Sequence, residues 1–159
     1  MSSPFPSPSP LATFFTSFAS LGFTYNSRAR TDTEYRRLRK QSFFNDSIKA
    51  QFHAAFEQEF DALICDGRRL CEILGVEPIP ESQTQKKKAL AGIHVNIYDL
   101  LEYARKWALD RDTAGTLKRF GNVKELANYS KARKRIYPRD EAKGQGALRF
   151  MLRVLFGRR

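Results

Sequence analysis

The chain has few of the residues on which disulfide scaffolds and metal sites depend. Its 159 residues include two cysteines and two histidines. Two cysteines do not make a disulfide framework, which favours a reducing compartment. Cys65 and Cys71 are six positions apart, with His53 and His94 as single histidines far on either side, and this spacing fits none of the usual short zinc motifs. We therefore expect no metal and no cofactor.

Long hydrophobic runs are also missing. No apolar stretch approaches the roughly 18 residues that cross a bilayer, so no membrane span is expected. The apolar segment LATFFTSFASLGF lacks the positive start and the clear cleavage site of a secretory signal. No acid precedes Asp32, whereas Arg28 and Arg30 do, which leaves a transit segment open as an alternative. We predict a cytoplasmic or nuclear protein.

Catalytic motifs are absent as well. There is no G-x-S-x-G elbow, and His94 has no serine or cysteine near it in a suggestive context. The segment GTLKRFGN does not have the order of a phosphate-binding P-loop. Glu57 and Asp61 lie one helical turn apart, but two such carboxylates are typical of a solvated helix face. The sequence thus predicts a protein that is not an enzyme.

Aromatic residues are plentiful, with 13 Phe and 6 Tyr, and 42% of the chain is hydrophobic, as expected of a folding chain. The Ser/Pro tract predicts a disordered tail over residues 1–12, followed by a single helical domain over residues 13–157. Helical spacing of apolar residues predicts an all-α fold, a compact bundle of six or seven short helices. Thr31 and Glu34 are spaced as a capping box. The other expected N-caps are Asn45 or Asp46, Asp66, Ser82, Asn96 and Asn122.

Charge is distributed unevenly. Residues 1–103 hold 12 Lys/Arg and 12 Asp/Glu, whereas residues 104–159 hold 16 Lys/Arg and five Asp/Glu, so the whole net charge of +11 lies in the last third. Such an asymmetry favours an anionic partner, although a high net charge also serves solubility alone. The densest run is YSKARKR, in a predicted helix that opens at Asn122 and is closed by Pro138. There, Lys124, Lys131, Lys134 and Arg135 are expected to approach one side.

A cluster of this density is expected to repel itself unless an anion covers it, since one or two cations satisfy the negative end of a helix. Gly144 and Gly146 precede the last helix, predicted over residues 146–156, and their backbone N–H groups either reach an anion or only allow a sharp turn. Tyr129 and Tyr137 flank the run and either stack on bases or belong to the core. The candidate anion-binding residues are Lys131, Arg133, Lys134, Arg135, Arg139, Lys143 and Arg149.

Several blocks of the sequence resemble a family of small proteins from filamentous fungi. These blocks are the Phe-rich start with its E-Y-x-R-L helix, LCEILGVEPIPES, HVNIYDLLEYAR, VKELANYS and RIYPRDEAKGQGALRFMLRVLF, which together cover most of residues 14–156. Members of that family are mostly described as uncharacterised, so the resemblance implies a fungal intracellular protein and little chemistry. The run SKARKR is more basic here than the family leads one to expect.

The function predicted from the sequence is that of a non-enzymatic helical module whose basic C-terminal third contacts a polyanion, most plausibly nucleic acid. Phosphate neutralisation by the basic run would supply the affinity, with little reading of bases. Three alternatives stay open: nuclear targeting by KARKR, a protein-interaction adaptor with an apolar groove between the Phe-rich helices, and an accessory or small-molecule-binding protein in a fungal pathway. The sequence does not define the oligomeric state.

Overall fold

The computed structural model describes residues 9–64, 66–144 and 146–156, without the side chains of Arg139 and of residues 154–156. Within these residues the fold is all-α, as predicted, with eight α-helices where six or seven were expected. The only pairing of extended backbone described is an isolated bridge between His94 and Phe120. No helix in the described part of the chain is long and apolar enough to cross a membrane. The α-helices are α1 (Pro10–Thr16), α2 (Thr31–Arg39), α3 (Asp46–Ile64), α4 (Gly67–Ile73), α5 (Gln83–Ala91), α6 (Ile97–Leu109), α7 (Val123–Ala132) and α8 (Ala147–Phe156), with 3-10 turns at Ala19–Leu21 and Arg139–Glu141.

Most helices begin where a short polar side chain caps them. Each cap accepts a hydrogen bond from the backbone N–H three residues further on, which satisfies one of the unpaired donors of the first turn. The side chains of Asn45, Asp66, Ser82, Asn96 and Asn122 all do so, over 2.9–3.2 Å. These five predicted caps are confirmed.

The N-terminal boundaries differ from those predicted. Helix α1 already begins at Pro10, because Ser9 caps it and proline suits the first helical position. Leu11 is fully buried, so residues 10–12 belong to the folded domain and not to the tail, while residues 1–8 lie outside the described part. The predicted capping box is also wrong: Arg30 occupies the N-cap position of α2 without a side-chain cap, and Glu34 instead accepts the N–H of Asn26.

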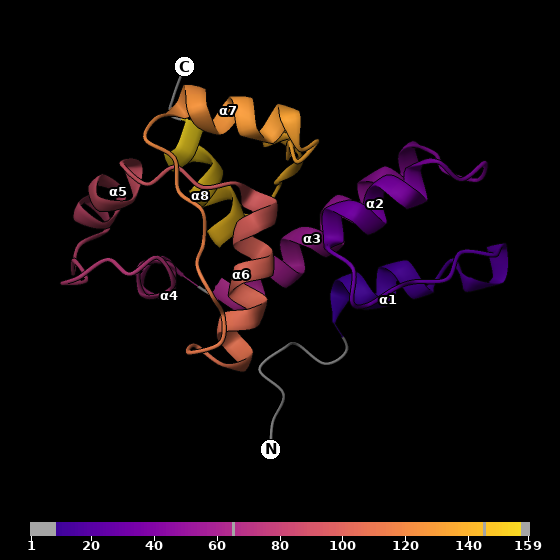
Figure 1. The fold of residues 1–159 in the computed structure, drawn as a ribbon, viewed down its shortest axis with the longest axis horizontal. Coiled ribbons are helices and arrows are strands. Elements are labelled where there is room, and N and C mark those ends of the chain that lie inside the picture. The colour runs from indigo at the N-terminus through magenta and orange to yellow at the C-terminus, as the bar shows by residue number, and fades with distance from the viewer. Residues whose placement is uncertain (1–8, 65, 145, 157–159) are drawn as a thin grey trace.

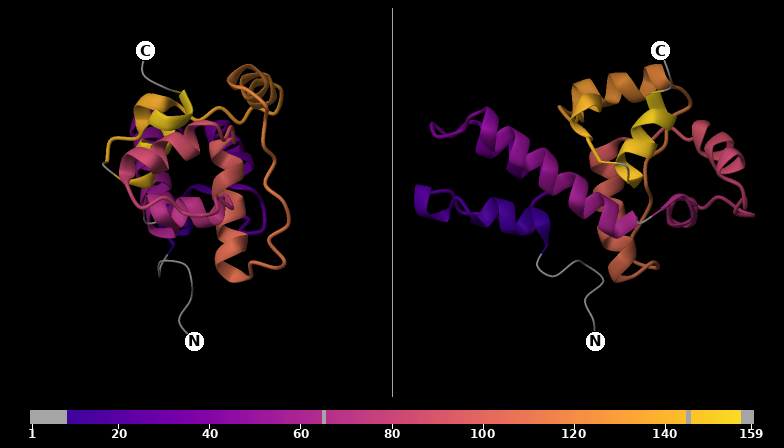
Figure 2. Two further views of the ribbon diagram at one scale, coloured as in Figure 1. Left: turned by 90° about the vertical axis from the view of Figure 1, so that its left-hand side faces the viewer. Right: turned by 180° about the vertical axis from the view of Figure 1, so that it is seen from behind.

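Helix α3 is the longest helix and runs through the molecule (Figure 1). Its N-terminal half packs with α1 and α2 into an arm, and its C-terminal half passes beneath a body formed by α4 to α8 (Figure 1). Helix α6 stands across α3, and α7 lies over the top of the body (Figures 1 and 2). Arm and body meet where the start of α2 packs against α6.

The core is built largely from aromatic rings along α3. Phe52, Phe56 and Phe60 are fully buried, and the ring of Phe52 stacks on that of Tyr35 with centroids 3.7 Å apart. Phe14 and Phe15 of α1 pack against Phe52 from the other side, so one row of rings joins α1, α2 and α3. Because these Phe side chains fill the core, they offer little surface to a partner.

Candidate polyanion-binding surface

The basic run lies at the end of α7, where the helix stops earlier than predicted. Arg133 is the C-cap, and Lys134 takes the left-handed conformation with φ of 56°. The N–H of Lys134 donates to the carbonyl of Lys131 over 3.2 Å, and that of Arg135 to the carbonyl of Ser130 over 2.8 Å. These two bonds form a Schellman motif, with lysine in the place that glycine usually takes.

This ending changes the expected arrangement of the cations. The prediction that Lys124, Lys131, Lys134 and Arg135 share one side of a helix is wrong, because Lys134 and Arg135 lie beyond its last turn. Lys131, Arg133 and Lys134 are exposed, and no ion pair to an acid of the described residues holds any of them. Three of the four clustered cations are therefore free to meet an external anion.

Arg135, the fourth cation of the cluster, is not exposed as the sequence led us to expect. Its side chain is only 19% exposed and pairs with two buried carboxylates, Asp32 at 3.2 Å and Asp99 at 3.2 Å. Its guanidinium also donates to the hydroxyl of Tyr129 over 2.7 Å, and that hydroxyl donates to Asp99 over 2.6 Å. Arg135 is thus neutralised inside the protein, and its charge is not free to meet an external anion.

The same network holds the arm to the body. Arg30, before α2, pairs with Asp32 at 2.9 Å and with Asp99 of α6 at 2.6 Å. The side chain of Asn96 donates to the carbonyl of Arg135 over 2.8 Å, which fixes the backbone just after the basic run. Three separate segments are therefore tied together at this point: the start of α2, the start of α6 and the end of α7.

A cationic surface forms where the second half of α2 faces the end of α7. A hollow of about 610 Å³ lies between them; we call it the α2 hollow. No acid lines it, and five of its six lining residues are cationic. The lining residues are Thr33, Arg36, Arg37, Arg39, Lys40 and Lys134.

The acidic residues of α2, whose charges offset its cations in the sequence sum, are buried behind this surface. Asp32 and Glu34 are 2% exposed each, and they pair with Arg36 at 3.6 Å and with Arg37 at 2.7 Å. Asp32 is shared by Arg30, Arg36 and Arg135, so two carboxylates, Asp32 and Asp99, face three guanidiniums. Among the described residues, no acid pairs with Arg39, Lys40 or Lys134, which lie in front.

Sequence reasoning missed the contribution of α2. Its RRLRK segment places four cations in five positions, the same density as the predicted run, but the sum over residues 1–103 is zero. That sum concealed the fact that the neighbouring acids point inward. Counting the charges of residues 36–40 alone would have indicated a second basic cluster.

The loop before α8 is held by hydrogen bonds to two carboxylates of α3. The N–H groups of Lys143 and Gly144 donate to Glu57 over 3.2 and 3.0 Å, and that of Leu148 donates to Asp61 over 2.9 Å. A Cβ on Gly146 would collide with the Asp61 carboxylate, which explains the glycine. Burial raises the pKa of Asp61, while the N–H groups at the start of α8 act against that rise. The anion that this loop binds is therefore part of the protein, and Glu57 and Asp61 are not a solvated pair.

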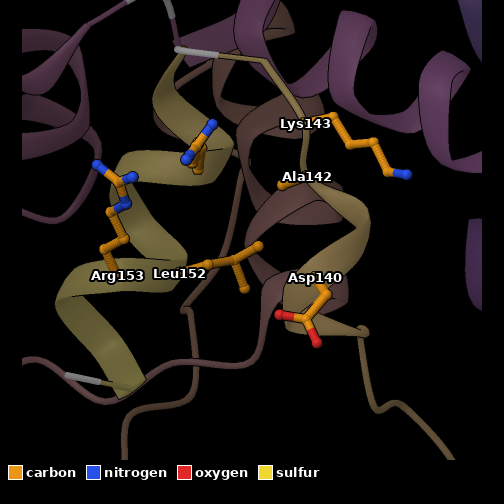
Figure 3. A pocket seen from close by; sticks show the side chains of 6 residues that line it. Asp140, Ala142, Lys143, Leu152 and Arg153 are labelled. Atoms are coloured by element: carbon orange, nitrogen blue, oxygen red, sulfur yellow. The ribbon is translucent and has the colours of Figure 1, made fainter. Parts of the chain in front are cut away.

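Lys143 and Arg149 line a second hollow, separate in its lining from the α2 hollow. It has a volume of about 450 Å³ and includes Asp140, Ala142, Leu152 and Arg153. Lys143 extends away from Arg153, and Leu152 lies between them (Figure 3). Lys143 and Arg153 therefore do not converge on one point, and the acid Asp140 also lines the hollow. The side chain of Arg139, the remaining predicted residue, lies outside the described part of the chain.

A smaller and mostly apolar cavity borders the basic run on the side of α6 and α7. Its volume is about 150 Å³, and we call it the apolar slot. Ile136, one of its walls, is 58% exposed. The slot is lined by Asn96, Ile97, Leu126, Ala127, Ser130, Lys131, Arg135, Ile136 and Tyr137.

The two tyrosines that flank the run belong to the folded interior. Tyr137 is 5% exposed, and its hydroxyl lies 3.2 Å from Nδ1 of His53. Burial raises the pKa of Tyr137 and lowers the pKa of His53 to about 4, so His53 is neutral at pH 7. Tyr129 is half-buried against Phe120, with ring centroids 4.8 Å apart. The ring of Tyr137 is therefore not available to stack on a base, and the ring of Tyr129 already packs against Phe120.

The described residues contain no group of three or more His, Cys, Asp or Glu side chains that could hold a metal ion. Cys71 is buried and unpaired, and Cys65 lies outside the described residues.

No protein-family model, curated protein or solved structure matches the chain. The resemblance to the fungal family therefore stays a prediction.

Proposed function

We propose that this protein binds a polyanion, most plausibly nucleic acid, on the surface where α2 meets the end of α7. The observation that supports this proposal is the α2 hollow, with five cations around it and no acid in its lining. Exposed Lys131 and Arg133 continue the positive surface along the end of α7. An intracellular phosphate backbone is the anion that such an extended, multiply charged surface fits.

The mechanism is neutralisation of successive phosphates by Arg39, Lys40, Lys131, Arg133 and Lys134. Each phosphate contact releases counterions, so affinity falls steeply as salt rises. Most of these side chains are long and flexible, and they contact the backbone of the nucleic acid rather than its bases. Little sequence preference is expected.

A binding assay with two charge-matched variants tests this proposal. The variant Arg39→Gln/Lys40→Gln/Lys134→Gln removes three cations from the α2 hollow. The control Lys86→Gln/Lys87→Gln/Lys88→Gln removes three from α5, on the far side of the body (Figure 1). Affinity for a short oligonucleotide is measured across a salt series.

The slope of log affinity against log salt should lose roughly 2–3 units in the α2-hollow variant, since about 0.7–0.9 is lost per phosphate contact. The α5 control should keep a slope close to that of the wild type. Equal losses in the two variants would show that binding follows net charge alone, and an affinity of the wild type that does not depend on salt would remove the proposal.

A further inference from the structure

We infer that the apolar slot takes one base of a single-stranded nucleic acid whose phosphates lie on the basic run; this inference rests on the proposed function. The slot and the α2 hollow both border the basic run, residues 131–135. Lys131 lines the slot, whereas Lys134 lines the hollow. A nucleic-acid strand that crosses the run can place a base in the slot and a phosphate at the α2 hollow.

The size and lining of the slot fit one aromatic ring. A cavity of about 150 Å³ lined by aliphatic and aromatic side chains holds one benzene ring. The slot has the same volume, and its walls include Ile97, Leu126 and Ile136. A bound ring would cover the exposed side chain of Ile136 and remove its apolar surface from water.

Apart from Lys131, the polar side chains that line the slot are engaged within the protein. The side chain of Asn96 donates to the hydroxyl of Ser130 over 2.9 Å, and this hydroxyl donates to the carbonyl of Leu126 over 2.8 Å. The side chain of Arg135 is held by Asp32 and Asp99. With these groups occupied, the slot provides mainly apolar contact and little hydrogen-bond reading of the base.

Only a single strand can use the slot. Bases in a duplex are stacked and paired, and a base must leave the stack to enter a pocket. The charge of the surrounding surface selects an occupant attached to a phosphate chain rather than a neutral apolar molecule. A single strand provides both the ring and the charges.

The test compares two oligonucleotides of equal length and charge, one with bases and one with abasic sugars, against the wild type and three variants. Ala127→Phe fills the slot from an exposed helical position, and Ala132→Phe places the same side chain on α7 outside the slot lining. Ile136→Ser removes one apolar wall. Circular dichroism of all four proteins shows that each is folded.

The wild type should bind the base-bearing strand about tenfold more tightly than the abasic strand, the scale of one base contact. Ala127→Phe and Ile136→Ser should abolish that difference and leave abasic binding unchanged, and Ala132→Phe should change neither. Equal binding of both strands by the wild type, or a preference that survives in Ala127→Phe, would overturn the inference while the polyanion proposal stands. Binding of neither strand at low salt would instead remove the proposed function.

Discussion

At the scale of single residues, neighbouring cations of one run have opposite roles. Arg133 and Arg135 are two positions apart and identical in type, but Arg133 is exposed while Arg135 is enclosed between Asp32 and Asp99. The partners of Arg135 lie 103 and 36 positions away in the chain. No local pattern indicates such a pairing, so sequence reasoning could predict the cluster but not which of its members is neutralised.

This difference predicts that the same substitution has unequal effects on stability at the two positions. Arg135→Gln should lower the free energy of unfolding by roughly 2–3 kcal/mol, because it removes the charged hydrogen bonds to Asp32 and Asp99 and leaves only Arg30 and Arg36 beside these buried carboxylates. Arg133→Gln, its matched control, should change the free energy by no more than about 0.5 kcal/mol. Urea denaturation at neutral pH measures both. If Arg135→Gln were as stable as the control, the buried network would not hold the arm to the body.

At the scale of elements, the end of α7 determines the shape of the surface. The sequence predicted where most helices begin, because Asn, Asp and Ser caps act over three residues. It did not predict where α7 ends, because no glycine or proline lies between Asn122 and Pro138 and lysine is an uncommon residue for a left-handed position. The bonds of the Schellman motif show that the chain turns at Lys134 and directs it to the α2 hollow.

The left-handed conformation of Lys134 predicts that one substitution there changes stability and binding in opposite directions. Lys134→Gly should raise the free energy of unfolding by about 1 kcal/mol, because glycine takes a φ of 56° without steric cost. The same change should weaken nucleic-acid binding by removing a phosphate contact. Lys131→Gly, within the helix, should instead lower stability by about 1 kcal/mol.

Denaturant unfolding and an oligonucleotide titration of these two glycine variants give both quantities. A destabilised Lys134→Gly protein would contradict the assigned conformation of this residue. Unchanged binding in that variant would show that Lys134 does not contact the polyanion.

At the scale of the whole molecule, the distribution of charge differs from its distribution along the sequence. The first 103 residues sum to zero, but Asp32, Glu34, Glu59 and Asp99 are buried, so much of their negative charge is withdrawn from the surface. Arg105 neutralises Glu59 at 2.9 Å, just as Arg30 and Arg135 neutralise Asp99. The fold therefore combines cations of α2 with those of the basic run into one surface.

The all-α class and most helix starts followed from residue patterns within a few positions. The site did not, because it depends on how α2 and the end of α7 pack in space. Of the seven predicted residues, Lys131, Arg133 and Lys134 stay on the proposed surface, whereas Lys143 and Arg149 lie at the second hollow and Arg135 is internal. The side chain of the seventh, Arg139, lies outside the described part of the chain. The charges that completed the surface came from a segment whose sequence sum is balanced.

Lysine footprinting of the complex tests this central claim most directly. The intact protein is acetylated with and without a saturating oligonucleotide at low salt, and each lysine is quantified by mass spectrometry. We predict protection of Lys40, Lys131 and Lys134, with Lys86, Lys87, Lys88 and Lys143 labelled as in the free protein. Protection centred on α5 or on Lys143, or the same protection at every lysine, would contradict a binding surface between α2 and the end of α7.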